Sequence, residues 1–354
     1  MTKEPDIAEQ RLRNQLITPP GRRHPENVVS WLGATQAQEY GPAKWALGLR
    51  SAHGTTDAAI DRAIDQGRIL RTHVLRPTWH FVTPADIRWM LELTSPQVHR
   101  TMSGYDRQLG LDIGVMTRAA GIIERAIGDC GHLTRGELGA HLERAGLPAR
   151  SRELAHIMMY AELEGLICSG PRRQNKFTYA LLADRAPAAR RLSRDEALAE
   201  LTLRYFTSHG PATIRDFVWW SGLRTTDVRL GLEMNRARSC EMDGLQYWTV
   251  GRSARRKPSR EATVHLLPVY DEYLVAYRDH RAVPRPAYAF GGLQHALVIE
   301  GQVAGAWRAT LAKNGIGVNV SPLRRLTPKE RRGVALTGER YGKFLGMQVF
   351  LSIL

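Results

Sequence analysis

The chain has little of what marks secreted, membrane-spanning or metal-bound proteins. It has only three cysteines in 354 residues, Cys130, Cys168 and Cys240, and they are too far apart for a disulfide framework or a CxxC metal site. No apolar run approaches the roughly 20 residues that span a bilayer. Residues 1–15 lack the apolar core of a signal peptide. We therefore expect a cytoplasmic protein with no membrane partner and no structural metal.

The sequence motifs of several large enzyme classes are also missing. The chain has no Walker loop, no HExxH, no GxSxG and no GxGxxG after a predicted strand. These absences leave no candidate nucleophile, nucleotide site or metal-binding helix. We expect an activity that needs no cofactor.

Acidic residues are scarce relative to basic ones. There are 35 Asp and Glu against 50 Lys and Arg, which gives a net charge of +15 and a pI near 10.2. Arginine predominates, and its guanidinium binds two phosphate oxygens at once. This charge favours nucleic acid as the partner. The alternative is the arginine-rich composition of a GC-rich genome.

The segment 34–40, ATQAQEY, carries the most suggestive pair of side chains. In an extended segment, residues two apart point to the same side, so Gln36 and Gln38 would lie side by side. Each amide has one acceptor oxygen and two donor hydrogens. Together they can orient a water molecule, although neither is a strong base. By itself, Gln-x-Gln is more often an exposed piece of helix or loop.

One order of elements recurs three times along the chain: three helices, then two strands. The helices are predicted at 6–17, 42–51 and 57–66; at 115–128, 133–146 and 151–165; and at 195–210, 214–223 and 228–236. The strands are predicted within 68–82, 166–182 and 239–250. This is the order of a winged helix, a class that places a helix in a DNA groove. Winged helices also serve as protein-binding modules, and the basic charge favours DNA.

The other segments complete the predicted architecture. Two helices at 84–93 and 96–109 read as a linker, and the valine-rich C-terminal part reads as a small β-barrel or sheet with one helix. The predicted class is α+β, with three tandem winged-helix domains and a C-terminal β-barrel-like domain. The expected divisions are 1–83, 84–114, 115–185, 193–250 and 262–354.

Basic and aromatic residues near the predicted wings and linkers are candidates for DNA contact. They are Arg76, Trp79 and His80 of the first wing, Arg172, Arg173 and Lys176 of the second, and Arg255 and Arg256 of a basic linker. Packing in the wings and a solvated linker are the alternatives. Asp271 and Glu272, in PVYDEYL, lack the spacing of a metal site and read as a strand and turn at a domain junction.

Taken together, these motifs resemble a known family. TQAQEYGPAKWALGLR, THVLRPTWHFVTPAD, LLPVYDEYLVAYRDH and a VxGxW strand are similar to the winged-helix DNA glycosylases related to the azinomycin-resistance enzyme AlkZ. The resemblance implies a monofunctional glycosylase in which Gln36 and Gln38 place the attacking water. It further implies bulky N7-alkylguanine adducts or interstrand cross-links in double-stranded DNA as substrates, and a role in genotoxin self-resistance. We expect a monomer.

The chemistry of this lesion fits a pair of neutral amides. An N7-alkylated guanine carries a positive charge and leaves as a neutral base, so no strong acid is needed. Orientation of the water and electrostatic fit to an oxocarbenium-like transition state then lower the barrier. The alternatives are a non-catalytic winged-helix transcriptional regulator and, less favoured, an interaction scaffold. The sequence leaves the particular adduct open, as well as the use of base flipping.

Overall fold

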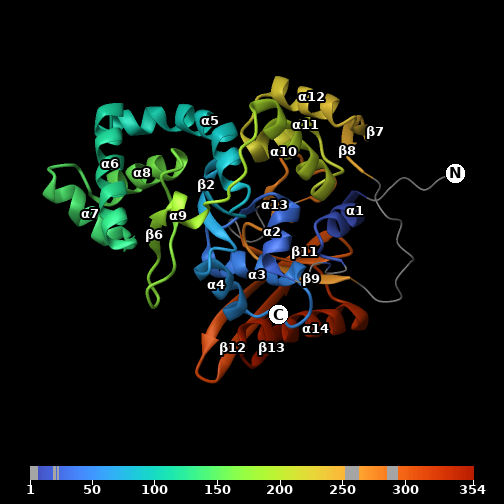
Figure 1. The fold of residues 1–354 in the computed structure, drawn as a ribbon. Helices are drawn as coiled ribbons and strands as arrows, with labels where there is room; N and C mark the ends of the chain where they lie inside the picture. Colours follow the sequence, from blue (N-terminus) through green and yellow to red (C-terminus); the bar gives the residue numbers. More distant parts are fainter. Residues whose placement is uncertain (1–6, 19–20, 22–23, 252–262, 285–293) are drawn as a thin grey trace.

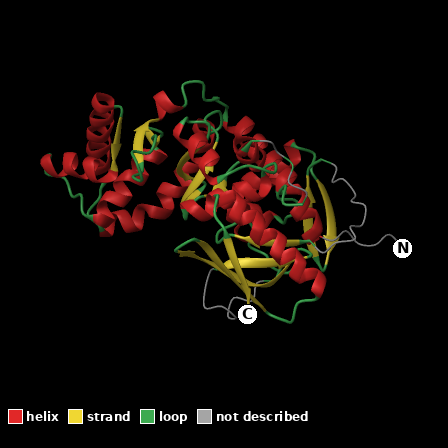
Figure 2. Cartoon of the chain, turned by 90° about the horizontal axis from the view of Figure 1, so that it is seen from below, coloured by secondary structure: helices red, strands yellow, loops and turns green. Residues whose placement is uncertain are grey.

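Helices and strands are mixed throughout the computed structural model (Figure 1; Figure 2). It describes residues 7–18, 21, 24–251, 263–284 and 294–354. The α+β class predicted from the sequence is confirmed. Figure 1 shows the second segment (green) extending to one side, while the N-terminal helices (blue) lie against the C-terminal strands and helix (red).

The first segment forms helices around a three-stranded sheet. Its elements are α1 (Ile7–Asn14), α2 (Pro25–Leu32), β1 (Thr35–Gln36), α3 (Tyr40–Arg50), α4 (Asp57–Asp65), β2 (Leu70–Val74) and β3 (Arg76–Val82). The strand order is β1-β3-β2, so β1 is an edge strand. The sequence predicted neither α2 nor the pairing of β1. At the start of α4, the Thr56 side chain accepts a hydrogen bond from Ala59 N and so caps the helix.

Helix α5 (Ile87–Gln108) is one continuous element, so the prediction of two linker helices is wrong. Pro96 lies inside it, although a proline in a helix interior costs about 3 kcal/mol because it lacks the backbone N–H. Trp89 and Met90 on the same helix are fully buried. Their packing outweighs the cost of the proline, and α5 is part of a core rather than a loose connection.

The second segment has the predicted order of helices and hairpin. Its elements are α6 (Ile113–Cys130), β4 (His132–Thr134), α7 (Arg135–Arg144), α8 (Ser151–Leu163), β5 (Ile167–Ser169), β6 (Thr178–Leu181) and α9 (Leu182–Arg185). Thr134 and Glu137 form a reciprocal capping box at the start of α7. The short strand β4 was not predicted and joins β6 at the sheet edge.

The third segment also matches its predicted order. Its elements are α10 (Arg194–Ser208), α11 (Ile214–Ser221), α12 (Thr225–Met234), β7 (Arg238–Met242) and β8 (Leu245–Thr249). The hairpin turns at Asp243 and Gly244, which both have positive φ angles, as a two-residue hairpin turn requires.

The described strands of the C-terminal part form an open sheet, which is the second of the two predicted alternatives, a small barrel or a sheet. Its elements are β9 (Val264–Leu267), α13 (Glu272–Val275), β10 (His295–Ile299), β11 (Gln302–Ala312), β12 (Gly315–Pro322), α14 (Pro328–Leu345) and β13 (Val349–Ile353). The order β13-β12-β11-β10-β9 leaves β9 and β13 at opposite edges. Helix α14 makes the crossover that brings β13 parallel to β12.

Three apolar cores hold these elements together. One contains residues of α1–α4 together with residues of β9–β12 and α14. A second combines β2, β3 and α5 with α10–α12, and a third lies within the second segment. In the first core, the indole N–H of Trp45 donates to the Leu266 carbonyl at 2.8 Å. The first segment therefore shares its core with the C-terminal sheet.

Candidate active site

The two glutamines lie on an extended edge segment of the three-stranded sheet. Gln36 is opposite His80 of β3, and the next residue, Ala37, donates its N–H to the Trp79 carbonyl at 2.7 Å. Gln36 and Gln38 are half-buried, whereas Ala37 between them is fully buried. This alternation agrees with the predicted extended segment, in which the two amides share one side.

Neighbouring groups fix the orientation of both amides. Arg76 Nη2 donates to Gln36 Oε1 at 3.0 Å, and Trp79 N donates to Gln38 Oε1 at 3.4 Å. The backbone N–H of Gln36 donates to Glu272 Oε1 at 2.6 Å. A carbonyl oxygen accepts two hydrogen bonds. Among the described residues, each amide therefore keeps one acceptor position and its two N–H donors for a water or a substrate.

Arg76, predicted to contact DNA, is placed in the site itself. Besides Gln36, it contacts the Trp219 carbonyl through Nη1 at 3.5 Å, and its guanidinium carbon lies 5.7 Å from the Trp219 ring centroid. Burial lowers the pKa of Arg76, and the negative charge of Glu272 opposes that effect. Arg76 connects β3 to α11, which carries the half-exposed Trp219 indole.

His80 does not fit its predicted role as a DNA contact, because its side chain is completely buried. Its Nδ1 lies 2.9 Å from the Thr78 carbonyl. Burial, followed by the charge of Arg76, lowers the pKa of His80 to about 3, so the imidazole is neutral. Trp79 is half-buried, and the Arg71 guanidinium carbon lies 4.3 Å from its ring centroid.

Two of the basic residues predicted to contact DNA in the second wing are paired with carboxylates. Arg172 contacts Asp61 at 3.0 Å and Asp65 at 3.2 Å, and so ties the second wing to α4. Arg173 contacts Glu137 at 2.7 Å across the second segment. Within this structure, both arginines hold protein elements together.

The other predicted basic contacts differ in position. Lys176 is exposed at the turn of the second hairpin, where its backbone pairs with that of Arg173. Arg255 and Arg256 lie outside the described residues. DNA contact by these residues stays a prediction.

Glu272 is a site residue that the sequence did not identify. Its segment was interpreted as strand and turn, but β9 ends at Leu267 and Asp271 caps the short helix α13. Arg50, at the end of α3, binds both oxygens of Asp271 at 2.7 Å. This buried pair fixes α13 beside β1 and so brings Glu272 to Gln36. The signal in the sequence that could have indicated Glu272 was the Asp-Glu-Tyr tripeptide shortly after Pro268.

Glu272 is ionised in this buried position. Burial acts to raise its pKa, but the hydrogen bond to His209 and the positive charge of Arg76 lower it to about 2. His209 is itself fully buried, and burial lowers its pKa. Arg71 also donates to the backbone carbonyls of Ala37 and Gln38, at 3.0 and 3.3 Å, so two guanidiniums and the Glu272 carboxylate lie around the glutamine segment.

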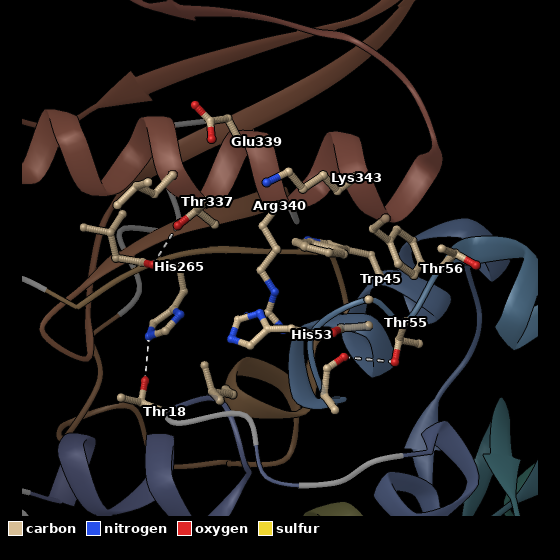
Figure 3. A pocket seen from close by; sticks show the side chains of 17 residues that line it. Thr18, Trp45, His53, Thr55, Thr56, His265, Thr337, Glu339, Arg340 and Lys343 are labelled. Atoms are coloured by element: carbon tan, nitrogen blue, oxygen red, sulfur yellow. Dashed lines mark hydrogen bonds between the residues drawn. The ribbon is translucent and has the colours of Figure 1, made fainter.

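A separate cavity of about 540 Å³ lies between the end of α3, β9 and α14 (Figure 3). Trp45 forms part of its wall, and His265 Nε2 lies 2.8 Å from the Thr18 hydroxyl. Arg340 donates to the carbonyls at the C-terminal end of α3. None of the site residues predicted from the sequence lines this cavity.

The described residues contain no group of three or more His, Cys, Asp or Glu side chains that could hold a metal ion. No helix in the same part of the chain has the length and apolarity needed to cross a membrane. Cys130, Cys168 and Cys240 are all free thiols, and burial raises the pKa of Cys168 to about 12.

Comparison with known proteins gives this architecture its class: it is that of a DNA glycosylase, an enzyme that hydrolyses N-glycosyl bonds. The model of the family described as DNA glycosylase AlkZ-like matches residues 29–344, and the chain belongs to this family. The match covers most of the chain, including the glutamine segment and α13. The chain is therefore a DNA glycosylase and acts on DNA.

Two comparisons give more detail. The chain is 25% identical over 328 residues to an interstrand DNA cross-link repair glycosylase from Streptomyces sahachiroi, covering 84% of this chain and 85% of that protein. The solved structure of Streptomyces sahachiroi DNA glycosylase AlkZ has the same fold, with a TM-score of 0.78 and 21% identity over 99% of this chain and 98% of the other. The alternative of a non-catalytic regulator is not favoured by these findings.

Proposed function

We propose that this glycosylase removes bulky N7-alkylguanine adducts, including interstrand cross-links, and that Gln36 and Gln38 position the attacking water. The observation that carries the proposal is the pair of half-buried amides at the end of the edge strand β1 and directly after it, with both oxygens already oriented by neighbouring donors. The repair of interstrand cross-links named for the Streptomyces sahachiroi relative supports the choice of lesion.

The reaction needs little acid–base chemistry from the protein. The N-glycosyl bond breaks, and the cationic alkylated base takes the electron pair and leaves as a neutral group. The attacking water forms the new bond to the anomeric carbon of the sugar and releases one proton to the solvent. The acceptor positions left on Gln36 and Gln38 receive the hydrogens of this water, which directs an oxygen lone pair at the sugar. Glu272, whose Oε1 accepts the Gln36 N–H at 2.6 Å, places a negative charge beside this segment.

Base release from N7-alkylated duplex DNA tests the proposal. Single-turnover rates are measured for the wild type, Q36A, Q38A and Q246A, the last being an exposed glutamine on β8 that serves as a matched control. We expect each site variant to be about 100-fold slower or more, because a misplaced nucleophile costs on that order. Unchanged rates in Q36A and Q38A would contradict the role of the pair.

The substrate range is tested by pairing two lesions. A duplex with a bulky N7 adduct and the same duplex cross-linked between its strands are each incubated with enzyme, and strand separation on a denaturing gel reports unhooking. We expect abasic sites from the adduct and single strands from the cross-link. Release of small N7-methylguanine only, with both bulky substrates intact, would limit the enzyme to simple alkylation damage.

We also propose a structural basis for DNA binding. The three helix-and-strand segments are winged helices, the divisions between them follow the predicted boundaries, and the exposed Lys176 hairpin contacts DNA phosphate. The +15 charge supports this, because phosphate contacts release counter-ions. The corresponding cellular role is that of a cytoplasmic monomer that protects its host from a genotoxin made by the host itself.

Duplex affinity should fall steeply between 50 and 200 mM salt. K176A should reduce the slope of log affinity against log salt concentration by about one.

A further inference from the structure

Strand β1 has one edge without a neighbouring strand, and the Glu272 carboxylate binds a backbone N–H on that edge. In the order β1-β3-β2, the Ala37 N–H faces β3 and the Gln36 N–H faces away from it. An edge N–H that is buried and unpaired costs free energy comparable to a lost hydrogen bond. Glu272 Oε1 accepts this N–H at 2.6 Å, so the carboxylate takes the place of a neighbouring strand.

The carboxylate is itself held rigidly. Only 2% of Glu272 is exposed. Its Oε2 accepts the Trp220 indole N–H at 2.8 Å and lies 3.4 Å from His209 Nε2. Because Trp220 is on α11 and His209 follows α10, the third segment fixes the position of Glu272.

Glu272 differs from the neighbouring Asp271 in its partners. Asp271 forms two short hydrogen bonds with Arg50, as a buried ion pair usually does. Among the described residues, no Lys or Arg nitrogen lies within 4 Å of Glu272. Burial of an ionised carboxylate without a paired cation is costly, and a purely structural role would be met by a neutral group. The Arg76 guanidinium binds the Gln36 side chain instead.

From this geometry, and on the basis of the proposed function of the glutamine pair, we infer that Glu272 is a positioning residue for catalysis. It fixes the Gln36 backbone by accepting one charge-assisted hydrogen bond from the Gln36 N–H, while Arg76 fixes the Gln36 side chain by donating to its amide oxygen. Together, the two contacts fix the position and orientation of Gln36 Oε1, the oxygen that accepts a hydrogen from the water. Glu272 has no contact with the reacting atoms and acts through Gln36.

A double-mutant cycle tests this inference. In E272Q, the negative charge is lost. Glutamine offers one acceptor oxygen in place of two, so the Gln36 N–H and the Trp220 N–H no longer each have their own acceptor, and we expect Gln36 to shift. We expect the single-turnover rate to fall about 100-fold with duplex affinity unchanged. The double variant E272Q/Q36A should be no slower than Q36A, because residues that act as one unit are not additive. D86N, which alters another buried and paired carboxylate without a contact to β1, serves as the control.

A second measurement reads the contact directly and does not depend on catalysis. A short bond to a carboxylate moves an amide proton resonance downfield and slows its exchange. With ¹⁵N-glutamine labelling, the Gln36 amide should move upfield and exchange faster in E272Q but not in D86N. If E272Q does not fold, E272D serves instead, because it keeps the charge and shortens the reach by one methylene.

The outcomes separate the two proposals. A wild type that releases no base, or a Q36A variant as fast as the wild type, contradicts the proposed function. A slow Q36A with a normal rate in E272Q, an additive double variant or an unmoved Gln36 amide contradicts only the role of Glu272. A slow E272Q with a non-additive cycle and a shifted amide supports it.

Discussion

Gln36 illustrates how much of a functional residue is set by its neighbours. The amide is held by Arg76, its own backbone by Glu272, and its strand by β3. None of these partners lies within thirty residues of it in the chain. The side chain that would bind water is therefore oriented by two separate parts of the protein, β3 and α13.

Buried histidines predict how stability depends on pH. Burial lowers the pKa of His265 from 6.5 to about 3, and the charges of Arg340 and Arg50 act in the same direction. The unfolded chain then takes up a proton near pH 6.5 that the folded chain does not. This contribution to stability is complete above pH 6.5 and is lost as pH falls towards 3.

The variant H265Q isolates this contribution. Between pH 7 and pH 5, the wild type should lose about 2 kcal/mol of unfolding free energy through this residue, and H265Q should not. Urea unfolding at several pH values measures the difference. Parallel curves for the two proteins would show that His265 titrates normally in the folded state.

At the scale of elements, α3 directly follows the glutamine segment and packs against α14, so this contact supports the segment. A Cβ added at Gly48 would lie 2.7 Å from the Phe344 ring, whereas one added at Gly121 in α6 would meet nothing within 4 Å. Replacing a helix glycine by alanine ordinarily stabilises by roughly 1 kcal/mol. At Gly48 the steric conflict should prevail, since overpacking costs about 1–3 kcal/mol.

We therefore expect G48A to lower the thermal midpoint and G121A to raise it. Both replace a glycine inside a helix, so intrinsic helix propensity cancels between them. Differential scanning calorimetry provides the measurement. A G48A variant as stable as G121A would mean that α3 and α14 separate easily.

The elements show which patterns can be interpreted locally. The hairpin at Asp243 and Gly244 and the capping box at Thr134 were predictable because each depends on a few adjacent residues. The two-residue β1 was not, because its partner β3 is forty residues away. Likewise, an alternating valine-rich strand is compatible with both a barrel and an open sheet.

At the scale of the whole molecule, the cores do not follow the order of the chain. The second segment has a core of its own, whereas the first shares one with the C-terminal sheet. In Figure 1 the second segment accordingly projects from the rest. Residues 109–186 should fold when produced alone, whereas residues 1–83 should not.

Circular dichroism and amide dispersion of the two fragments test this expectation. The fragment 109–186 should unfold cooperatively, and the fragment 1–83 should remain largely unfolded because Trp45 and its neighbours lack the C-terminal strands. Addition of the C-terminal fragment 263–354 should restore structure to 1–83. A stably folded 1–83 would instead establish the first segment as an independent domain.

The sequence alone determined the basic charge, the α+β class, most of the helices, the candidate glutamines and the resemblance to the glycosylase family. These follow from composition, short-range periodicity and motifs. Only the tertiary structure decided that His80 is buried, that the C-terminal sheet is open and that Glu272 supports Gln36 from 236 residues away. The physical reason is that burial and hydrogen-bond pairing between distant segments depend on how the cores assemble, which no local pattern encodes.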